Sequence, residues 1–184
     1  MPQSFDLFFA SSNIHKFQEA KKILNDFGIN LGFYKCQLEE IQSNSMKEIA
    51  KNKAVQAFDK CKKPIIVEDD GLFIESLNGF PGPYSSYVFK TIGNKGILKL
   101  LKQERKAKFI SIISFYDKKN NKSFESQLNG IISKKIVGLG WGYDPIFIPS
   151  KSKETFAQLK NKNELSHRFK SLKKFSNWYL DKKG

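Results

Sequence analysis

The longest run of acidic residues in the chain consists of Glu68, Asp69 and Asp70, which follow the apolar residues 65–67. Adjacent carboxylates repel one another, and a bound cation relieves that repulsion. Because carboxylate oxygens are hard ligands, the run suggests Mg²⁺. In an extended segment Glu68 and Asp70 would face one side and Asp69 the other. A solvated strand end would have the same composition, so spacing alone leaves both interpretations open.

A second pair of acids, Glu39 and Glu40, precedes a predicted helix and could complete a metal site from across a cleft. Mg²⁺ usually takes one or two protein carboxylates and fills its remaining positions with water and substrate phosphates. A basic chain with few clustered acids is suited to such a site.

A polar turn, Ser11, Ser12 and Asn13, separates a β-prone run from a helical pattern, and Lys16 follows one turn later. The start of a helix exposes unpaired N–H groups and a positive dipole end, which together bind anions. Ser and Asn are also the commonest helix caps, and an ordinary cap is the more economical interpretation of this segment alone. The glycine patterns of a phosphate loop or a dinucleotide fold are absent.

A third group of residues could bind a heterocycle. Trp141, Tyr143 and Asp144 lie in a glycine-punctuated loop, and Lys162, His167 and Arg168 occur later. Flat aromatic rings offer a stacking surface, while lysine and arginine offer donors to ring oxygens or phosphates. Core packing would explain each aromatic residue taken alone. Only the aromatic residues together with the later basic residues indicate a base pocket.

The elements that must position these residues follow from hydrophobic spacing. Residues 5–10 are typical of a strand, and the apolar residues 17, 20, 24 and 27 have helical spacing. Ser45 and Glu48 form a capping box at the start of a second helix, in which Lys53 is the one charge on the apolar face. Residues 65–67 predict a buried strand that ends at the acids.

Farther along, residues 109–116 and 123–132 predict an antiparallel hairpin around a short polar turn, and residues 97–101 look helical. A last helix carries its apolar face at residues 165, 169, 172, 176 and 179. This mixture of elements predicts the α/β class. No internal repeat or long linker is found, so residues 1–184 are interpreted as a single domain, with two lobes.

Composition limits the classes of partner. The chain has 184 residues, 40% of them hydrophobic, and a formal net charge of +14. It is long enough to bury roughly 70% of its unfolded surface, and the charge favours anionic partners. Thirty of the 32 basic residues are lysines, whereas sequence-specific nucleic-acid binders usually rely on the planar fork of arginine. We therefore expect no specific nucleic acid.

Sequence features also bear on location. No apolar run approaches the ~20 residues of a membrane span, and no secretory signal precedes the first apolar run. Cys36 and Cys61 lack a CxxC or Cys/His pattern, so we expect reduced thiols and no zinc site. The expectation is a cytoplasmic protein without membrane contact.

Five motifs, taken in order, resemble those of the inosine triphosphate pyrophosphatase family, which hydrolyses non-canonical purine nucleoside triphosphates to monophosphate and pyrophosphate. They are SSNIHK (11–16), EDDGL (68–72), LNGFPGPYS (77–85), GWGYDPIF (140–147) and KNELSHR (162–168). Two departures stand out. Ser11 and Ser12 replace a usual Thr-Gly, so the turn lacks its glycine. Asp70 replaces a usual Ser or Thr and adds negative charge.

The resemblance implies roles for these residues. Asp69 would position or deprotonate the attacking water and hold Mg²⁺ together with Glu40, and Glu68 would be a supporting catalytic acid. Residues implied to bind the substrate are Ser11, Ser12, Asn13, Lys16, Lys53, Asp70, Trp141, Gly142, Tyr143, Asp144, Lys162, His167 and Arg168. Preference for ITP, dITP and XTP over ATP implies donors that read the 6-keto oxygen of the base.

The resemblance also implies an elongated, two-lobed α/β domain with a mixed twisted sheet and a central active-site cleft, assembled as a homodimer. Two alternatives stay open. A Maf-like pyrophosphatase would share the chemistry but act on other bases. A basic nucleic-acid-binding module would bind nucleic acid with steep salt dependence and would turn nothing over.

Overall fold

The computed structural model describes residues 4–182, which form two compact units. Unit 1 comprises Met1–Asp69, Ser111–Ser126 and Arg168–Gly184, and unit 2 comprises Asp70–Ile110 and Gln127–His167. The elements are β1 (Leu7–Ser11), α1 (Ile14–Asp26), β2 (Leu31–Lys35), α2 (Met46–Cys61), β3 (Ile65–Ile74), η1 (Glu75–Leu77), η2 (Gly82–Tyr84), α3 (Ser85–Thr91), α4 (Gly93–Leu100), β4 (Lys106–Tyr116), β5 (Asn121–Ile132), β6 (Phe147–Pro149), α5 (Lys162–Leu165) and α6 (His167–Asp181).

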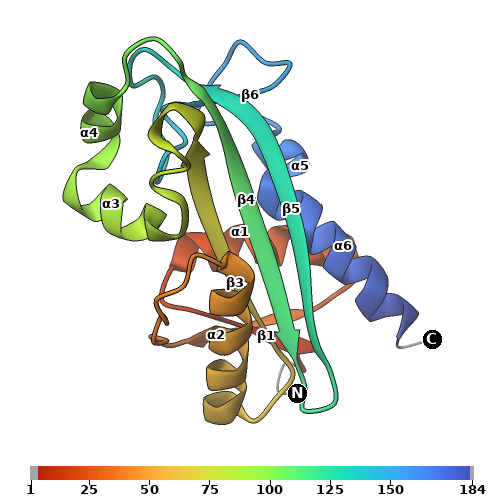
Figure 1. Ribbon diagram of the computed structural model, residues 1–184. Helices are drawn as coiled ribbons and strands as arrows, with labels where there is room; N and C mark the ends of the chain where they lie inside the picture. Colours follow the sequence, from red (N-terminus) through yellow and green to blue (C-terminus); the bar gives the residue numbers. More distant parts are fainter. Residues whose placement is uncertain (1–3, 183–184) are drawn as a thin grey trace. The chain divides into compact units, whose positions relative to one another are not determined.

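Across the described residues, one sheet of six strands has the order β2-β1-β3-β4-β5-β6 (Figure 1). Strand β1 pairs in parallel with both β2 and β3, with Leu7 opposite Leu31 and Phe8 opposite Ile65. Strands β5 and β6 pair antiparallel, and the arrows of β4 and β5 point in opposite directions (Figure 1). The sheet is therefore mixed, and the α/β class predicted from the sequence is confirmed.

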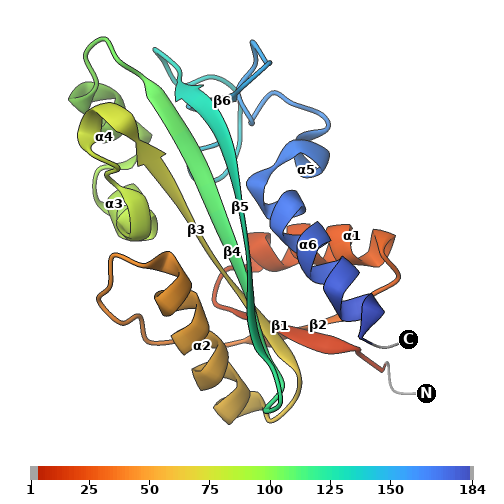
Figure 2. The ribbon, with the colours of Figure 1, turned by 45° about the vertical axis from the view of Figure 1, so that its right-hand side comes forward.

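Unit 1 has helices on both faces of its part of the sheet. Residues of α1 and α6, such as Leu24 and Phe175, pack with Ile66 of β3 in one buried cluster. Ala57 of α2 packs with Val67 in a second cluster. Since Ile66 and Val67 are neighbours in a strand, their side chains point to opposite faces. Figure 2 shows the same layers, with α1 and α6 on one side and α2 on the other.

Unit 2 has its own core. Leu72 and Ile74 of β3 and Phe109 of β4 pack with Val88 of α3 and Ile97 of α4. The glycine loop and β6 contribute apolar residues to the same cluster. The loop that carries the predicted base-binding residues therefore rests on the core of unit 2.

Local signals were reliable. Ser45 Oγ accepts a hydrogen bond from Glu48 N at 3.3 Å and caps α2 as predicted. The return half of the predicted capping box is replaced, because Ser45 N and the Glu48 carboxylate both bond to Ser43 Oγ. Asn13 Oδ1 accepts from His15 N at 3.0 Å and caps α1. The hairpin is confirmed as β4–β5 and the last helix as α6. Leu165 was wrongly placed on the apolar face of that helix, because it lies in α5 and is exposed. The interpretation of residues 1–184 as one catalytic domain of two lobes stays a prediction.

One boundary was wrong. The acids were expected at the end of the strand that begins at residue 65, whereas β3 continues through them to Ile74. Alternating burial of Leu72 and Ile74 extends the strand, and Glu68 is itself buried. The carboxylates therefore lie within the sheet, where each requires a partner.

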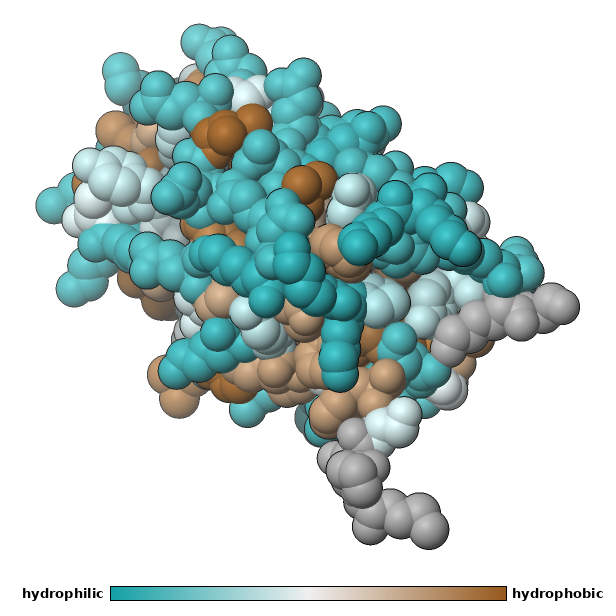
Figure 3. Space-filling model, turned by 90° about the horizontal axis from the view of Figure 1, so that it is seen from below, coloured by the Kyte–Doolittle hydropathy of each residue, from teal (hydrophilic) through white to brown (hydrophobic). Residues whose placement is uncertain are grey.

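The surface matches the composition. Hydrophilic residues cover much of the face drawn in Figure 3. No helix between residues 4 and 182 has the length and apolar character that a membrane span requires.

The turn between β4 and β5 yields a stability prediction. Asp117 accepts hydrogen bonds from Asn120 N at 2.8 Å and Lys182 Nζ at 2.8 Å. Desolvation acts to raise the pKa of Asp117, but the hydrogen bonds from Lys182 and Asn120 lower it overall. A lowered pKa stabilises the fold above the pKa of the unfolded state, and the contribution disappears as the pH falls through the folded-state pKa. Asp117→Ala should therefore reduce the free energy of unfolding by about 1 kcal/mol at neutral pH, a modest loss because solvent screens the site.

Urea denaturation at pH 7 and pH 3 measures this difference. Asp59→Ala is the matched control, since the one ion pair of Asp59 within residues 4–182 is a solvent-exposed pair with Lys62 at 3.4 Å. A loss at Asp117 that is as large at pH 3 as at pH 7 would contradict the prediction.

Candidate active site

Lys53 joins two predicted metal ligands in unit 1. It lies on α2 and is 8% exposed, and its Nζ donates to Asp69 Oδ1 at 2.5 Å and also to Glu40. The single charge on the apolar face of α2 thus pairs with carboxylates from β3 and from the segment before α2. The structure brings these three residues together, and phosphate binding by Lys53 stays a prediction.

Asp69 has one oxygen without a partner. Its Oδ2 is buried and accepts no hydrogen bond from the described residues. Burial raises the pKa of Asp69, although Lys53 and Lys16 act to lower it. A buried polar atom without a hydrogen bond is rare in native proteins and indicates a missing water, ion or ligand. A raised pKa also suits a carboxylate that accepts a proton.

Glu40 and Asp69 fit a magnesium site. Mg²⁺ is usually bound by one or two protein carboxylates. The carboxylates of Glu40 and Asp69 both pair with the Lys53 ammonium, and Asp69 Oδ2 has no hydrogen bond within the described residues. The side chain of Glu40 is 58% exposed and so can also reach water or substrate. No group of three or more His, Cys, Asp or Glu residues within positions 4–182 could hold a metal alone. Glu40 and Asp69 therefore suit an ion that takes its other ligands from phosphates and water.

Glu68 faces away from Asp69, as the alternation predicted. Its Oε2 accepts from Arg168 Nε at 2.7 Å, and its Oε1 accepts from Ser111 Oγ at 2.8 Å. Arg168 is 1% exposed and also binds the carboxylate of Glu19. The predicted base-binding arginine is thus held by two acids of unit 1, and its contact with a base stays a prediction.

The phosphate turn is ordered by its own side chains. Asn13 N donates to Ser11 Oγ at 3.0 Å, and Asn13 Oδ1 caps α1. Ser12 is exposed and Lys16 is half-buried. Lys16 is near enough to Asp69 to act on its pKa. The cap interpretation is confirmed, whereas anion binding at these residues is not tested.

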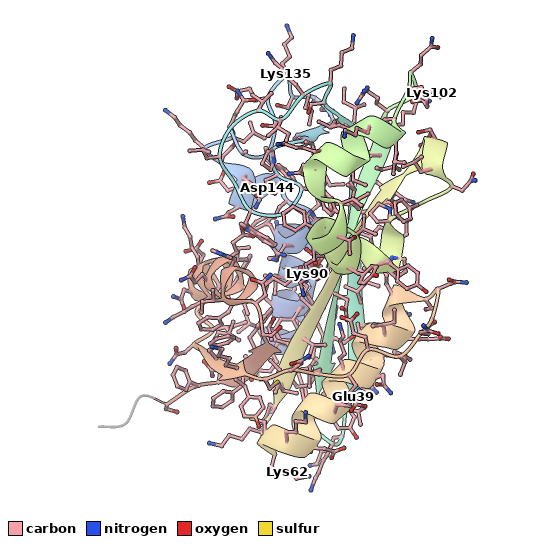
Figure 4. All side chains as sticks on the ribbon, turned by 90° about the vertical axis from the view of Figure 1, so that its left-hand side faces the viewer. Glu39, Lys62, Lys90, Lys102, Lys135 and Asp144 are labelled. Atoms are coloured by element: carbon pink, nitrogen blue, oxygen red, sulfur yellow. The ribbon has the colours of Figure 1, made fainter. Side chains whose placement is uncertain are left out.

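The glycine loop of unit 2 brings several predicted residues together. Lys162 Nζ donates to Asp144 Oδ2 at 2.7 Å and lies 5.3 Å from the centre of the Trp141 ring. Figure 4 labels Asp144 on this loop. A cation over an aromatic face is attracted by the ring, so Lys162 and Trp141 stabilise one another.

Two neighbouring loop residues are anchored by the helices. Tyr143 OH donates to the carbonyl of Ser85 at 2.9 Å, and burial raises the pKa of Tyr143. The carbonyl of Gly142, whose φ is +61°, accepts from Asn94 Nδ2 at 3.0 Å. The phenol therefore stays a neutral donor, and the loop backbone is tied to α3 and α4.

His167 and Asp70 are also brought together in unit 2. His167 Nε2 lies 3.7 Å from Asp70 Oδ2, and its ring stacks on Phe109 with centres 4.5 Å apart. Neither ring nitrogen of His167 has a hydrogen bond among the described residues. Asp70, the departure from the family motif, thus faces another residue of that motif.

Sequence reasoning missed the residues that support these groups. Ser111 is a hydroxyl inside an apolar strand pattern, which is a weak signal for a buried polar contact. Spacing gave no signal for the others, because their partners are distant in the sequence. The residues that the structure adds are Glu19, Ser85, Asn94, Phe109 and Ser111.

Comparisons with known proteins agree over nearly the whole chain. The sequence profile described as the Ham1 family matches residues 7–178. A dITP/XTP pyrophosphatase of Methanopyrus kandleri is 48% identical, and the match covers 94% of this chain and 95% of that protein. A dITP/XTP pyrophosphatase of Pyrococcus horikoshii is 44% identical, with 94% and 95% covered.

A solved structure is similar to this chain over nearly its whole length. A HAM1 protein from Coxiella burnetii has a TM-score of 0.85 at 27% identity, covering 97% of this chain and 100% of that one. Since the profile spans residues 7–178 and the relatives match along almost their full length, the chain belongs to the Ham1 family.

Proposed function

We propose that this protein hydrolyses ITP, dITP and XTP to the nucleoside monophosphate and pyrophosphate, and so removes deaminated purine nucleotides from the cytoplasmic pool. The observation that carries the proposal is the pair Glu40 and Asp69 on Lys53, with the buried Asp69 Oδ2 open to a further partner. Family membership and relatives named dITP/XTP pyrophosphatases support it.

The chemistry requires an oriented water and neutralised phosphates. Glu40 and Asp69 would hold Mg²⁺, which supplies positive charge to the phosphates when it is bound. Asp69 orients the attacking water and accepts its proton. A bond forms between the water oxygen and the α-phosphorus, the bond from that phosphorus to the bridging oxygen breaks, and pyrophosphate leaves.

The remaining site residues divide by unit. In unit 1, Ser11, Ser12 and Asn13 shape the phosphate turn, and Lys16 and Lys53 carry positive charge for the phosphates. Glu68 supports the strand that carries Asp69 by its buried bonds to Arg168 and Ser111. We propose that the chain acts as one catalytic domain and assembles as a homodimer.

Unit 2 supplies residues for the base. Trp141 offers a flat surface on the anchored loop, and Asp144 holds the ammonium of Lys162 in place. Tyr143 is buried in the core of unit 2, and the Gly142 carbonyl is bonded to Asn94, so these two residues hold the loop in position. Lys162 and backbone N–H groups of unit 2 are candidate donors to the 6-keto oxygen of the base, and Arg168 of unit 1 is the other candidate. Adenine has an amino group at that position, so it would leave a buried donor unpaired at a cost of about 1–3 kcal/mol.

His167 and Asp70 complete the set on the unit 2 side. His167 Nε2 lies 3.7 Å from Asp70 Oδ2, so these two residues would meet the substrate as a pair.

The first test measures pyrophosphate release from dITP, XTP, GTP and ATP with Mg²⁺. We expect turnover that favours dITP and XTP, and a loss of about 10²–10⁴-fold in Asp69→Asn, because the amide cannot accept the proton. Asp59→Asn makes the same change at an exposed position of α2 and should leave turnover unchanged.

Other outcomes identify other functions. Preference for a different nucleotide would keep the chemistry and favour a Maf-like specificity. No turnover with any triphosphate over a range of Mg²⁺ concentrations would contradict the proposal, and salt-dependent nucleic-acid binding would then be measured.

A second test addresses the base. Lys162→Met should raise the KM for dITP about 10- to 100-fold, the loss of a charged hydrogen bond, while ATP hydrolysis changes less. Lys160→Met removes an exposed lysine two residues earlier and serves as the control. Equal losses for dITP and ATP would show that Lys162 does not read the base.

A further inference from the structure

One face of α2 runs along the segment that carries Glu40. Residues 53, 56 and 60 are spaced by three and four positions, which places them in a row on one side of the helix. Each contacts the segment 37–40, which has neither helix nor strand structure. The contacts join Lys53 to Glu40, Gln56 to Glu39, and Lys60 to Gln37.

The row of helix residues 53–60 and the segment 37–40 match in length. From residue 53 to residue 60 a helix advances about 10.5 Å. Three residues of extended chain, from 37 to 40, span about 10 Å. The segment can therefore run antiparallel to the helix row in register, with every contact made at once.

Gln56 makes the central contact of this row. Its Oε1 accepts from Glu39 N at 3.1 Å, and its Nε2 donates to Glu39 O at 3.0 Å. A single side-chain amide thus satisfies both backbone groups of Glu39, as a neighbouring strand would. Nε2 also donates to Asn52 Oδ1 at 2.5 Å, which fixes the orientation of the amide. Figure 4 shows Glu39 beside α2.

The contact bears on the metal ligand next in sequence. Glu40 lies in an irregular segment and its side chain is 58% exposed, so its position depends on how the backbone before it is held. Ordering a mobile ligand when the ion binds costs conformational entropy and so weakens binding, whereas a ligand that is already ordered carries no such cost.

We propose that Gln56 is a positioning residue for Glu40: by holding both backbone groups of Glu39, it places the Glu40 carboxylate beside Lys53 for the divalent cation. The inference rests on the proposed function, because it takes Glu40 as a metal ligand. It adds a residue that touches neither the ion nor the substrate.

The test compares Gln56→Met with Gln18→Met in the full chain. Methionine matches glutamine in length and helix propensity but lacks both hydrogen-bonding groups. Gln18 lies exposed on α1 and makes no side-chain hydrogen bond within the described residues. Binding of Mn²⁺ alone is measured by electron paramagnetic resonance, and hydrogen exchange is measured over residues 36–45.

We expect Gln56→Met to weaken Mn²⁺ binding about threefold to tenfold, at or below the lower end of the effect of residues that support metal ligands. Exchange over residues 36–45 should accelerate, and kcat at saturating Mg²⁺ should stay within about twofold, because the reacting groups are intact. Lys60→Met, which removes the outer contact, should give a smaller change of the same sign. Gln18→Met should match the wild type in all three measurements.

Two results would overturn the inference. One is Mn²⁺ affinity in Gln56→Met equal to that of the wild type, whether or not exchange changes. The other is a wild-type chain that binds no Mn²⁺, which removes the ligand role of Glu40. Failure of the proposed function appears separately, as a wild-type protein that binds Mn²⁺ but releases no pyrophosphate from any triphosphate.

Discussion

Strand β3 carries consecutive carboxylates through the interior of a sheet, and a buried carboxylate without a partner is costly. Alternation along the strand sends Glu68 and Asp69 to opposite faces, so each needs its own cation. Arg168 from α6 serves Glu68, and Lys53 from α2 serves Asp69. The helices of unit 1 are therefore tied to the strand by charge as well as by apolar packing.

The two pairs differ in how completely they are satisfied. Both oxygens of Glu68 accept hydrogen bonds, from Arg168 and Ser111, so neither oxygen is left without a partner. Asp69 has a bond at Oδ1 and none at Oδ2. Neighbouring acids in one strand thus have different environments, which is the usual way that similar groups acquire different roles.

Local chemistry made part of this structure predictable. The caps at Asn13 and Ser45 and the hairpin follow from contacts within a few residues, which the sequence displays directly. The extent of β3 could not be predicted from such local contacts, because a buried Glu68 is stable in the sheet only through its bond to Arg168, one hundred positions later. Candidate site residues could likewise be named from motifs, but the contact of Gln56 with Glu39 needed the fold, since a half-buried glutamine on a helix carries no sequence signal.

At the proposed Mg²⁺ site, the charge around Lys53 favours binding of the cation before the triphosphate. The formal charges of two carboxylates and one ammonium sum to a net negative charge, which attracts a divalent cation and repels a triphosphate. Once the cation is held, the same group is net positive, and Lys16, which already acts on Asp69, adds to the field. Burial of Lys53 strengthens its attraction to the carboxylates and to a phosphate, because screening by water is reduced there. The Lys53 ammonium holds the two carboxylates together, and in the proposed function it would attract phosphate once the metal is bound.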